Sequence, residues 1–516
     1  MYQKTSSQIS FILPFGGTLR PDNRWVQLSE LLPWEKIEEK YSGNFPSKRG
    51  ARAISSRTAF GALIIKELLS LSDEETVVMI SEVPSMQYFL GFESFIQEIP
   101  FDPSMMVHFR KRFGMEFIEE VNQLLIQKGR KQKVESSDKD QYPPSPPAEA
   151  LQDSDQKTKG VPSEEVPQQG KLILDATCAP ADIHYPTDLA LLNKAREKSE
   201  EIIDVLYFNS PTKNKKPRTY RRKARQQYLK LARKKKLNKK EIRKGRTQQL
   251  NYLKRNLNHI AFLHEEVPLT VLSRIQYKNL LVIQEVYRQQ KILLETNSHS
   301  ISGRIVSIAQ PHVRPIVRGK SGTPTEFGAK ISASVCSDGF VSLDRVSWEA
   351  FNESGDLREQ VEKYRSKVGY YPEVVLADKI YRTRDNRNWC KKRGIRLSGT
   401  PLGRPPADTG LRRERYLQNR NDERERNAIE GKFGQAKRRF GLARIMAKLK
   451  GTSESMIALS FLVMNLVKLR ELLLFIFLFC FSWKIGKRTF LKNKSDFRDK
   501  FFEIMLPKPT LQILTS

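Results

Sequence analysis

The chain has 516 residues, which is enough for about two to four domains and a sizeable core. It carries 90 Lys and Arg residues against 58 Asp and Glu residues, a formal net charge of +32. So large an excess of positive charge indicates a polyanionic partner, and favours nucleic acid over an anionic membrane surface. The four cysteines are widely spaced without a C-x-x-C pair, which excludes a zinc ribbon, argues against a disulfide framework and fits a reducing cytoplasm.

Residues 1–130 are expected to form a small all-α domain. Three segments, 25–41, 58–82 and 106–127, place their apolar residues at helical spacing. Basic residues border these segments, so the domain is a candidate for DNA binding: Lys48, Arg49, Arg52, Arg57 and the run HFRKRFG. A helical domain used for dimerisation is the alternative.

Residues 131–170 lose hydrophobic side chains and gain Pro, Ser, Gln and acidic residues. This composition predicts a disordered linker. A linker of this kind would let the first domain dock independently of the rest of the chain.

Residues 171–470 alternate strand and helix signals and are expected to form an α/β catalytic domain. The first strand ends at Asp175, and a helical insertion at about 187–300 separates it from the next. The later signals, in order, predict strands at 303–310, 326–340 and 341–351, a helix at 356–369, a strand at 373–378, a helix at 382–394, a short strand at 395–399 and a helix around Glu430. Acidic residues at two strand ends, Asp175 and Asp378, and on the late helix match a ribonuclease H-like fold.

The insertion holds the densest positive charge of the chain, with twenty Lys and Arg residues against one acid within 213–256. Tyrosines are interleaved with these cations, a combination that favours binding to a nucleic-acid backbone. A solvated, mutually repelling face is the alternative. The candidate DNA contacts are Lys234, Lys235, Lys236, Lys239 and Lys240.

Three acids carry the expected chemistry. Asp175 ends the apolar run KLILD, Asp378 ends VVLAD, and Glu430 lies on a predicted helix. Converging carboxylates hold Mg²⁺ or Mn²⁺, and two such ions can activate a nucleophile and offset charge at a phosphodiester. The histidines show no zinc-binding spacing. Each acid also has a structural alternative: Asp175 could begin a turn, Asp378 could cap a helix, and Glu430 could pair with Arg426.

Arg426 and Lys437 share the helix face of Glu430, within roughly 40° of it at 100° per residue. They are candidate phosphate contacts, with solvated helix charges as the alternative. An adjoining apolar stripe would pack this helix onto the sheet: Ile429, Phe433, Ala436 and Phe440.

The C-terminal segment 471–516 begins with the apolar run 472–483 and continues as a basic tail. A membrane span needs about 20 apolar residues, so this run predicts a buried or dimer-facing helix and no membrane partner.

At these residues the chain resembles a bacterial insertion-sequence DDE transposase of the IS-five-like kind. Four stretches carry the resemblance: DATCAPADIHYPTD from Asp175, EFGAKISASVCSDGF from Glu326, VVLADKIY from Val374 and RNAIEGKFGQAKRRFGL from Arg426. In the family pattern Tyr-x₂-Arg-x₃-Glu-x₆-Lys, the chain matches Arg426, Glu430 and Lys437, but Glu423 stands in the tyrosine position.

The resemblance implies that Asp175, Asp378 and Glu430 bind metal, that the protein cuts double-stranded DNA at transposon ends, and that it joins the ends to target DNA. It further implies a homodimer or larger synaptic complex in a bacterial cytoplasm, associated with the nucleoid. Two alternatives stay open: a ribonuclease H-like nuclease without strand transfer, and a transposase-derived DNA-binding protein without catalysis.

Overall fold

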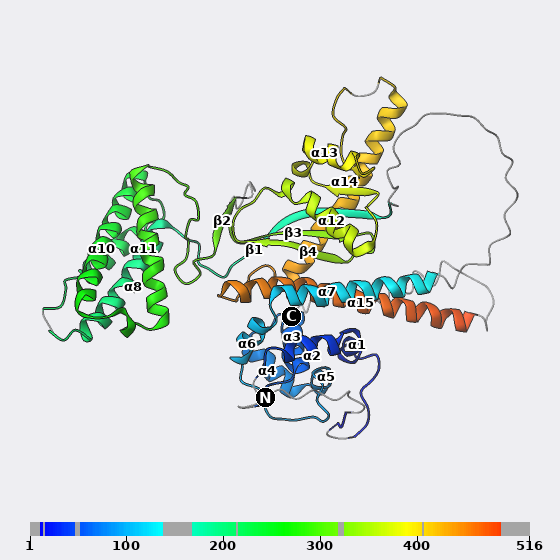
Figure 1. Cartoon of the computed structure of the whole chain (residues 1–516), viewed down its shortest axis with the longest axis horizontal. Coiled ribbons are helices and arrows are strands. Elements are labelled where there is room, and N and C mark those ends of the chain that lie inside the picture. The colour runs from blue at the N-terminus through cyan, green and yellow to red at the C-terminus, as the bar shows by residue number, and fades with distance from the viewer. Residues whose placement is uncertain are drawn as a thin grey trace, which may run out of the picture.

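The computed structural model describes residues 11–13, 16–46, 52–137, 168–212, 215–317, 325–404 and 407–486. A mixed β-sheet lies between two helical regions (Figure 1). Two long helices, α7 Met115–Ser137 and α15 Lys450–Gly486, run alongside each other on one side of the sheet. The helices before α7 lie beyond this pair, and the insertion projects on another side.

Between Arg24 and Ser137 the described chain is mainly helical, and each of the three expected helical segments contains two helices. Pro33 lacks a backbone N–H and separates the first two helices. Ser70 adopts a left-handed conformation with φ of 55°, and Ser72 then starts the next helix through a capping box with Glu75. The helices are α1 Arg24–Leu31, α2 Trp34–Ser42, α3 Ser56–Leu69, α4 Asp73–Glu82, α5 Pro84–Phe89, α6 Met105–Arg112 and α7 Met115–Ser137.

The expected linker lies mainly outside the described residues, which omit 138–167. Its first residues continue α7 as far as Ser137. The expected boundary at 470/471 falls inside one continuous helix, α15 Lys450–Gly486.

Helix α15 joins the N-terminal helices to the sheet through one apolar core. That core contains Phe60 of α3, Phe461 of α15 and Ile331 of the sheet, each fully buried. Asn465 of α15 donates to the carbonyl of Val341 at 2.7 Å and to Asn122 of α7 at 2.8 Å, and it accepts from the N–H of Val341. The expectation of independent docking is therefore wrong, because separating the N-terminal helices would expose this core and break these buried hydrogen bonds.

The sheet of the described chain has six strands in the order β2-β3-β1-β5-β6, with β4 also paired to β3. β1 is antiparallel to β3 and parallel to β5. The strands are β1 Lys171–Pro180, β2 Arg314–Val317, β3 Thr325–Cys336, β4 Val341–Ser347, β5 Val374–Ala377 and β6 Arg396–Leu397. The strand expected at 303–310 is wrong, because Ile305 and Ile308 pack into the core of the insertion instead.

Successive side chains of β1 point to opposite faces of the sheet, so the strand contributes to the core on each face. Leu172 and Leu174 face the core formed with α12 Leu357–Val368 and α13 Arg384–Lys391. Ile173 and Ala179 face the core that includes the buried stripe of α14 Thr409–Arg439. That stripe is the predicted one, with Ile429, Phe433, Ala436 and Phe440 all buried.

The insertion forms a helical bundle with its own two apolar cores. Asp188, at its start, pairs with Arg304 near its end at 2.7 Å and with Arg246 at 3.4 Å. These contacts close the insertion at its neck, where it meets the sheet. The helices are α8 Asp188–Phe208, α9 Arg221–Ala232, α10 Lys239–Glu266 and α11 Arg274–Glu295.

Candidate active site

The two predicted aspartates lie beside each other on neighbouring strands. The parallel pairing of β1 with β5 ends at Leu174 and Ala377, and Asp175 and Asp378 are the next residue of each strand's path. Asp175 is nevertheless inside β1 and does not end it, because β3 keeps pairing with β1 as far as Pro180. The site therefore lies where the pairing of β1 with β5 stops while its pairing with β3 continues.

Asp175 is a half-buried carboxylate in a field of mixed charge. Burial raises its pKa to about 6, although the N–H of Ala176 donates to it and the charge of Arg426 opposes the rise. The negative charges of Glu353 and Asp378 raise this pKa further. A carboxylate so placed gains from a bound cation, which would offset both its burial and the repulsion of its neighbours.

Helix α14 brings Glu430 to the same region, but its carboxylate is engaged. Arg426 pairs with Glu430 at 3.2 Å and with Glu423 at 3.1 Å. The charge of Arg426 also interacts with Asp378 and Asp175. The structural alternative for Glu430, an i−4 ion pair, is thus what the structure contains.

Within the described chain, no three His, Cys, Asp or Glu side chains are grouped closely enough to hold a metal ion. The three predicted ligands are therefore not a ready-made cluster, since Glu430 pairs with Arg426 while the two aspartates repel each other. The donor set still fits Mg²⁺ or Mn²⁺, because it consists of carboxylate oxygens whose mutual repulsion a divalent cation would relieve.

A buried hydroxyl beside these acids points to a missing polar group. Tyr381, three residues after Asp378, is fully buried, and its hydroxyl has no hydrogen-bond partner in the described chain. Burial raises its pKa, and the charges of Glu353 and Asp175 raise it further. An unpaired buried hydroxyl costs ~1–3 kcal/mol, so a hydrogen-bond partner such as a buried water molecule would be favoured here.

Four residues of this region were not predicted as site residues: Glu353, Tyr381, Arg382 and Glu423. Arg382 donates to the carbonyl of Ala377 at 2.8 Å and to Glu423 at 2.9 Å. In the tyrosine position of the family pattern, Glu423 therefore ties α14 to the end of β5, next to Asp378. The position of Tyr381 within VVLADKIY was the available signal, whereas no sequence signal identified Glu353.

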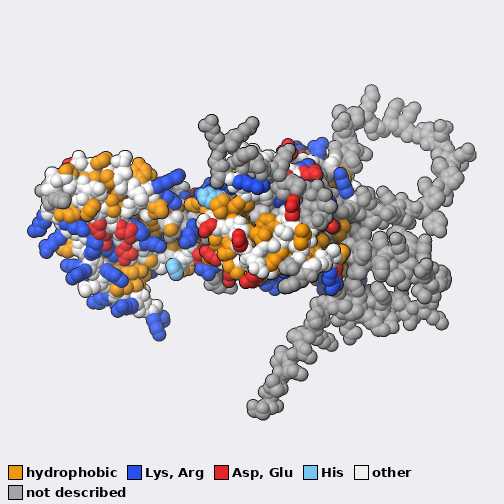
Figure 2. All heavy atoms as spheres, turned by 90° about the horizontal axis from the view of Figure 1, so that it is seen from below, with side chains coloured by type: hydrophobic (Ala, Val, Ile, Leu, Met, Phe, Trp, Pro, Cys, Tyr) orange, Lys and Arg blue, Asp and Glu red, His pale blue; other side chains and the backbone are white. Residues whose placement is uncertain are grey.

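The predicted phosphate contacts lie in two places. Lys437 is half-buried in the last turn of α14. The five predicted lysines are exposed around the turn between α9 and α10, where Lys234 pairs with Glu241 at 2.6 Å. Figure 2 shows Lys and Arg side chains gathered over the insertion, at the left of the view.

Two of the basic residues expected to edge the N-terminal domain have structural partners. Arg57 donates to the carbonyls of Tyr88 and Phe89, and Arg110 of HFRKRFG pairs with Asp73 at 2.7 Å. Lys48 and Arg49 lie outside the described residues. The DNA-binding prediction for this domain is therefore left with fewer cations than the sequence offered.

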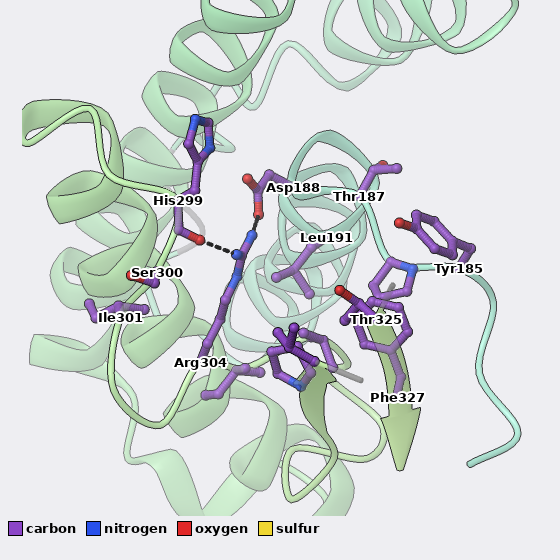
Figure 3. Close-up of a pocket in the computed structure, with 15 residues that line it drawn as sticks. Tyr185, Thr187, Asp188, Leu191, His299, Ser300, Ile301, Arg304, Thr325 and Phe327 are labelled. Carbon is purple, nitrogen blue, oxygen red and sulfur yellow. Dashed lines mark hydrogen bonds and ion pairs between the residues drawn. The ribbon is translucent and has the colours of Figure 1, made fainter. Parts of the chain in front are cut away.

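A cavity of about 320 Å³ lies at the neck of the insertion, away from the acids (Figure 3). Arg304 reaches from one side to Asp188 and to the carbonyl of His299, and Tyr185 meets Phe327 edge-on at 5.5 Å. None of Asp175, Asp378 and Glu430 lines it.

The helices of the described chain include none that is long and apolar enough to cross a membrane. The apolar run 472–483 continues α15; Leu472 to Leu474 are partly buried and Phe475 is exposed. The side chains of 476–483 lie outside the described residues.

Comparison with known proteins finds that two parts of the chain match models described as transposase domains. A model described as a transposase DDE domain matches residues 375–467, which include Asp378 and Glu430. A second model, described as a transposase domain (DUF772), matches residues 15–112 and so covers α1 to α6. The resemblance to an insertion-sequence transposase is confirmed, and a DDE domain implies a ribonuclease H-like fold, with which the mixed sheet agrees.

A relative in Rhizobium meliloti, an uncharacterized protein called ORF8 in the nfe locus, is 37% identical over 103 residues. The match covers 20% of this chain, and the chain spans about half (49%) of the relative's length. No solved structure matches the chain.

Proposed function

We propose that the protein is a DNA transposase of the IS-five-like kind that cleaves DNA at transposon ends and joins those ends to target DNA. The observation that carries this proposal is the adjacency of Asp175 and Asp378 on parallel strands, with the Arg426–Glu430 segment of α14 beside them. Asp175, Asp378 and Glu430 would hold Mg²⁺ or Mn²⁺, two ions in all. Such ions activate the attacking oxygen and offset the charge on the leaving oxygen.

The side chains of the site would divide the work between metal and phosphate. Asp175 is fixed by its strand and by the N–H of Ala176, so it would provide a rigid ligand. Glu430 would exchange its ion pair with Arg426 for the metal. Arg426, still held by Glu423, would then turn free N–H groups toward a phosphate oxygen, with Lys437 further along the same helix.

DNA would also be bound at surfaces outside the active site. The lysines at the α9–α10 turn would contact the phosphate backbone with little sequence preference. The N-terminal helices would help to recognise the transposon ends, and two or more copies would assemble on paired ends.

The test is a cleavage and strand-transfer assay with Mg²⁺ on DNA that carries the ends flanking the gene. Asp175→Asn, Asp378→Asn and Glu430→Gln are expected to abolish both reactions while end binding stays near wild type, because distant phosphate contacts remain. Glu425→Gln is the matched control, since Glu425 lies on the same helix but pairs with Lys171 at 2.9 Å.

The products separate the proposal from its alternatives. Cleaved ends that never join to target DNA would indicate a nuclease without strand transfer. End binding by the wild type without cleavage would indicate a DNA-binding protein without catalysis. Near wild-type cleavage by Asp175→Asn or Asp378→Asn would refute the metal-ligand assignment.

A further inference from the structure

Arg255 of α10 is held between two aromatic rings on the surface of the insertion. Its guanidinium carbon lies 4.7 Å from the ring centroid of Tyr220 and 5.4 Å from that of Tyr252. The hydroxyl of Tyr252 donates to Gln227 at 3.2 Å, which ties this ring to α9. Stacking on ring faces holds a guanidinium in place while its N–H edges stay available to an anion.

Three cations of the insertion are paired with acids, whereas Arg255 is not. Arg221 pairs with Asp204, Arg246 with Asp188 and Lys234 with Glu241. Across the described residues no carboxylate pairs with Arg255, and a second cation, Arg218, also lies over the Tyr220 ring at 5.7 Å. The cluster therefore gathers positive charge in a fixed geometry without an internal counter-ion.

The backbone at Tyr220 is in a strained conformation. Tyr220 precedes α9 with φ of 53°, in the left-handed region, and its side chain is 43% exposed. A non-glycine residue in this region costs on the order of 1 kcal/mol or more, and glycine would avoid most of that cost. A large exposed aromatic kept at such a position is typical of a binding site.

The cluster lies at the far end of the helix pair that carries the five lysines. Helices α9 and α10 run antiparallel, as shown by Gln249 donating to the carbonyl of Ala224 at 3.0 Å and by the Leu231 side chain packing on Gly245. From Lys239 to Arg255 a helix rises ~24 Å at 1.5 Å per residue. Successive phosphates of one DNA strand rise ~3.4 Å along the axis, so this length matches roughly seven base pairs.

We propose that Arg255, stacked between Tyr220 and Tyr252, is a phosphate-binding site for duplex DNA that runs along α9 and α10. Together with the lysines at the opposite end of these helices it gives the duplex two points of attachment and hence an orientation. The inference rests on the proposed function, because it takes the DNA of the transposase as the occupant.

The experiment measures the affinity of the full-length protein for a short fluorescent DNA duplex across a salt series. Losing one phosphate contact lowers the log–log salt slope by ~0.9, which corresponds to roughly 8-fold weaker binding near 0.1 M salt. Arg255→Gln is expected to show this loss. Arg288→Gln removes the same charge from an arginine paired with Glu285 at 2.6 Å, and is expected to change the slope little.

Two further variants separate binding from folding. Arg255→Lys keeps the charge but loses the planar stacking, so its affinity should fall below that of the wild type. Tyr220→Gly relieves the left-handed strain, so the melting temperature should not fall although binding weakens.

Equal slopes for Arg255→Gln and Arg288→Gln would overturn the proposal, and so would an effect of Arg255→Gln on single-stranded DNA but not on duplex. A wild-type protein that binds no duplex would instead count against the proposed function.

Discussion

Two helical regions flank the sheet, and they differ in how they are attached to it. The N-terminal helices share one apolar core with α15 and a face of the sheet. The insertion carries the densest positive charge of the chain and has two apolar cores of its own. Asp188 forms ion pairs at its neck. The first region therefore shares its core with the sheet, while the second has its own cores and is joined to the sheet at the neck.

The difference shows that distance in the sequence does not decide which segments fold together. Residues 1–130 are separated from the sheet by the segment expected to be a linker, yet α15 returns from the other end of the domain and buries them. The insertion interrupts the sheet's own sequence, yet its two apolar cores are separate from the core that contains the sheet. Stability of the sheet should consequently depend on the N-terminal helices and only weakly on the insertion.

The largest expected effect comes from opening a cavity in the shared core. Phe461→Ala should destabilise the protein by ~3–5 kcal/mol, because Phe461 is fully buried. Hydrogen exchange should increase together in α3, α7 and the sheet. Leu253→Ala is the matched change in the core of the insertion and should cost ~2–5 kcal/mol within the insertion alone. Faster exchange in the sheet of the Leu253 variant would contradict the separation of the two cores.

The pH dependence of stability should differ between the regions. Burial raises the pKa of Glu67, which accepts from Ser460 at the junction of α3 and α15, to about 7 from 4.5. Between these values the unfolded chain loses this proton and the folded protein keeps it, so Glu67 lowers the stability as pH rises from about 4.5 to about 7.

Glu67→Gln should remove this slope and stabilise the shared core by ~3 kcal/mol above pH 7, since one pKa unit corresponds to ~1.4 kcal/mol. Denaturant unfolding at a series of pH values measures it. An unchanged slope in the variant would show that Glu67 is not the titrating group.

The smallest of the three effects is expected at the neck. Burial alone would raise the pKa of Asp188, but Arg304 and Arg246 outweigh burial and hold it below 3.8. This contribution to stability is present above pH 3.8 and is lost as pH falls through the lower folded pKa, the opposite sign to Glu67.

Asp188→Asn should cost ~1.5–3 kcal/mol, the range for hydrogen bonds to charged groups, and should speed hydrogen exchange at the ends of α8 and α11. The shared core should keep its wild-type exchange, and Lys198→Ala, which breaks an exposed pair on α8, is the control.

Apolar periodicity predicted the parts of the fold that depend on local sequence. The runs ending at Asp175 and Asp378 gave adjacent strands, and the stripe around Ile429 gave the buried face of α14. The break at Ser70 was missed because a left-handed residue leaves the helical spacing on either side unchanged. The strand expected at 303–310 was wrong because its apolar residues are needed by a core made of distant helices.

The residues of the candidate site could be predicted from the sequence. Whether Glu430 pairs with Arg426 or is free to bind a metal could not, because the sequence left both alternatives open. The spacing of Arg426 and Glu430 fits both a phosphate contact beside a metal ligand and an ion pair, and the structure contains the ion pair. The contact of Arg382 with Glu423 joins residues 41 positions apart, which no local pattern specifies.

The neck of the insertion also bears on how such a chain can change over generations. Asp188 and Arg304 are 116 positions apart in the sequence but share a hydrogen bond of 2.7 Å. A segment whose two ends already meet can be lost, shortened or exchanged by one genetic event, because a short connection would span the same gap. The entropy of closing a loop grows only by ~0.6 kcal/mol for each doubling of its length, so the sheet tolerates a long segment there almost as well as a short one. We therefore expect that a chain with a shorter segment at this point would keep the same strands.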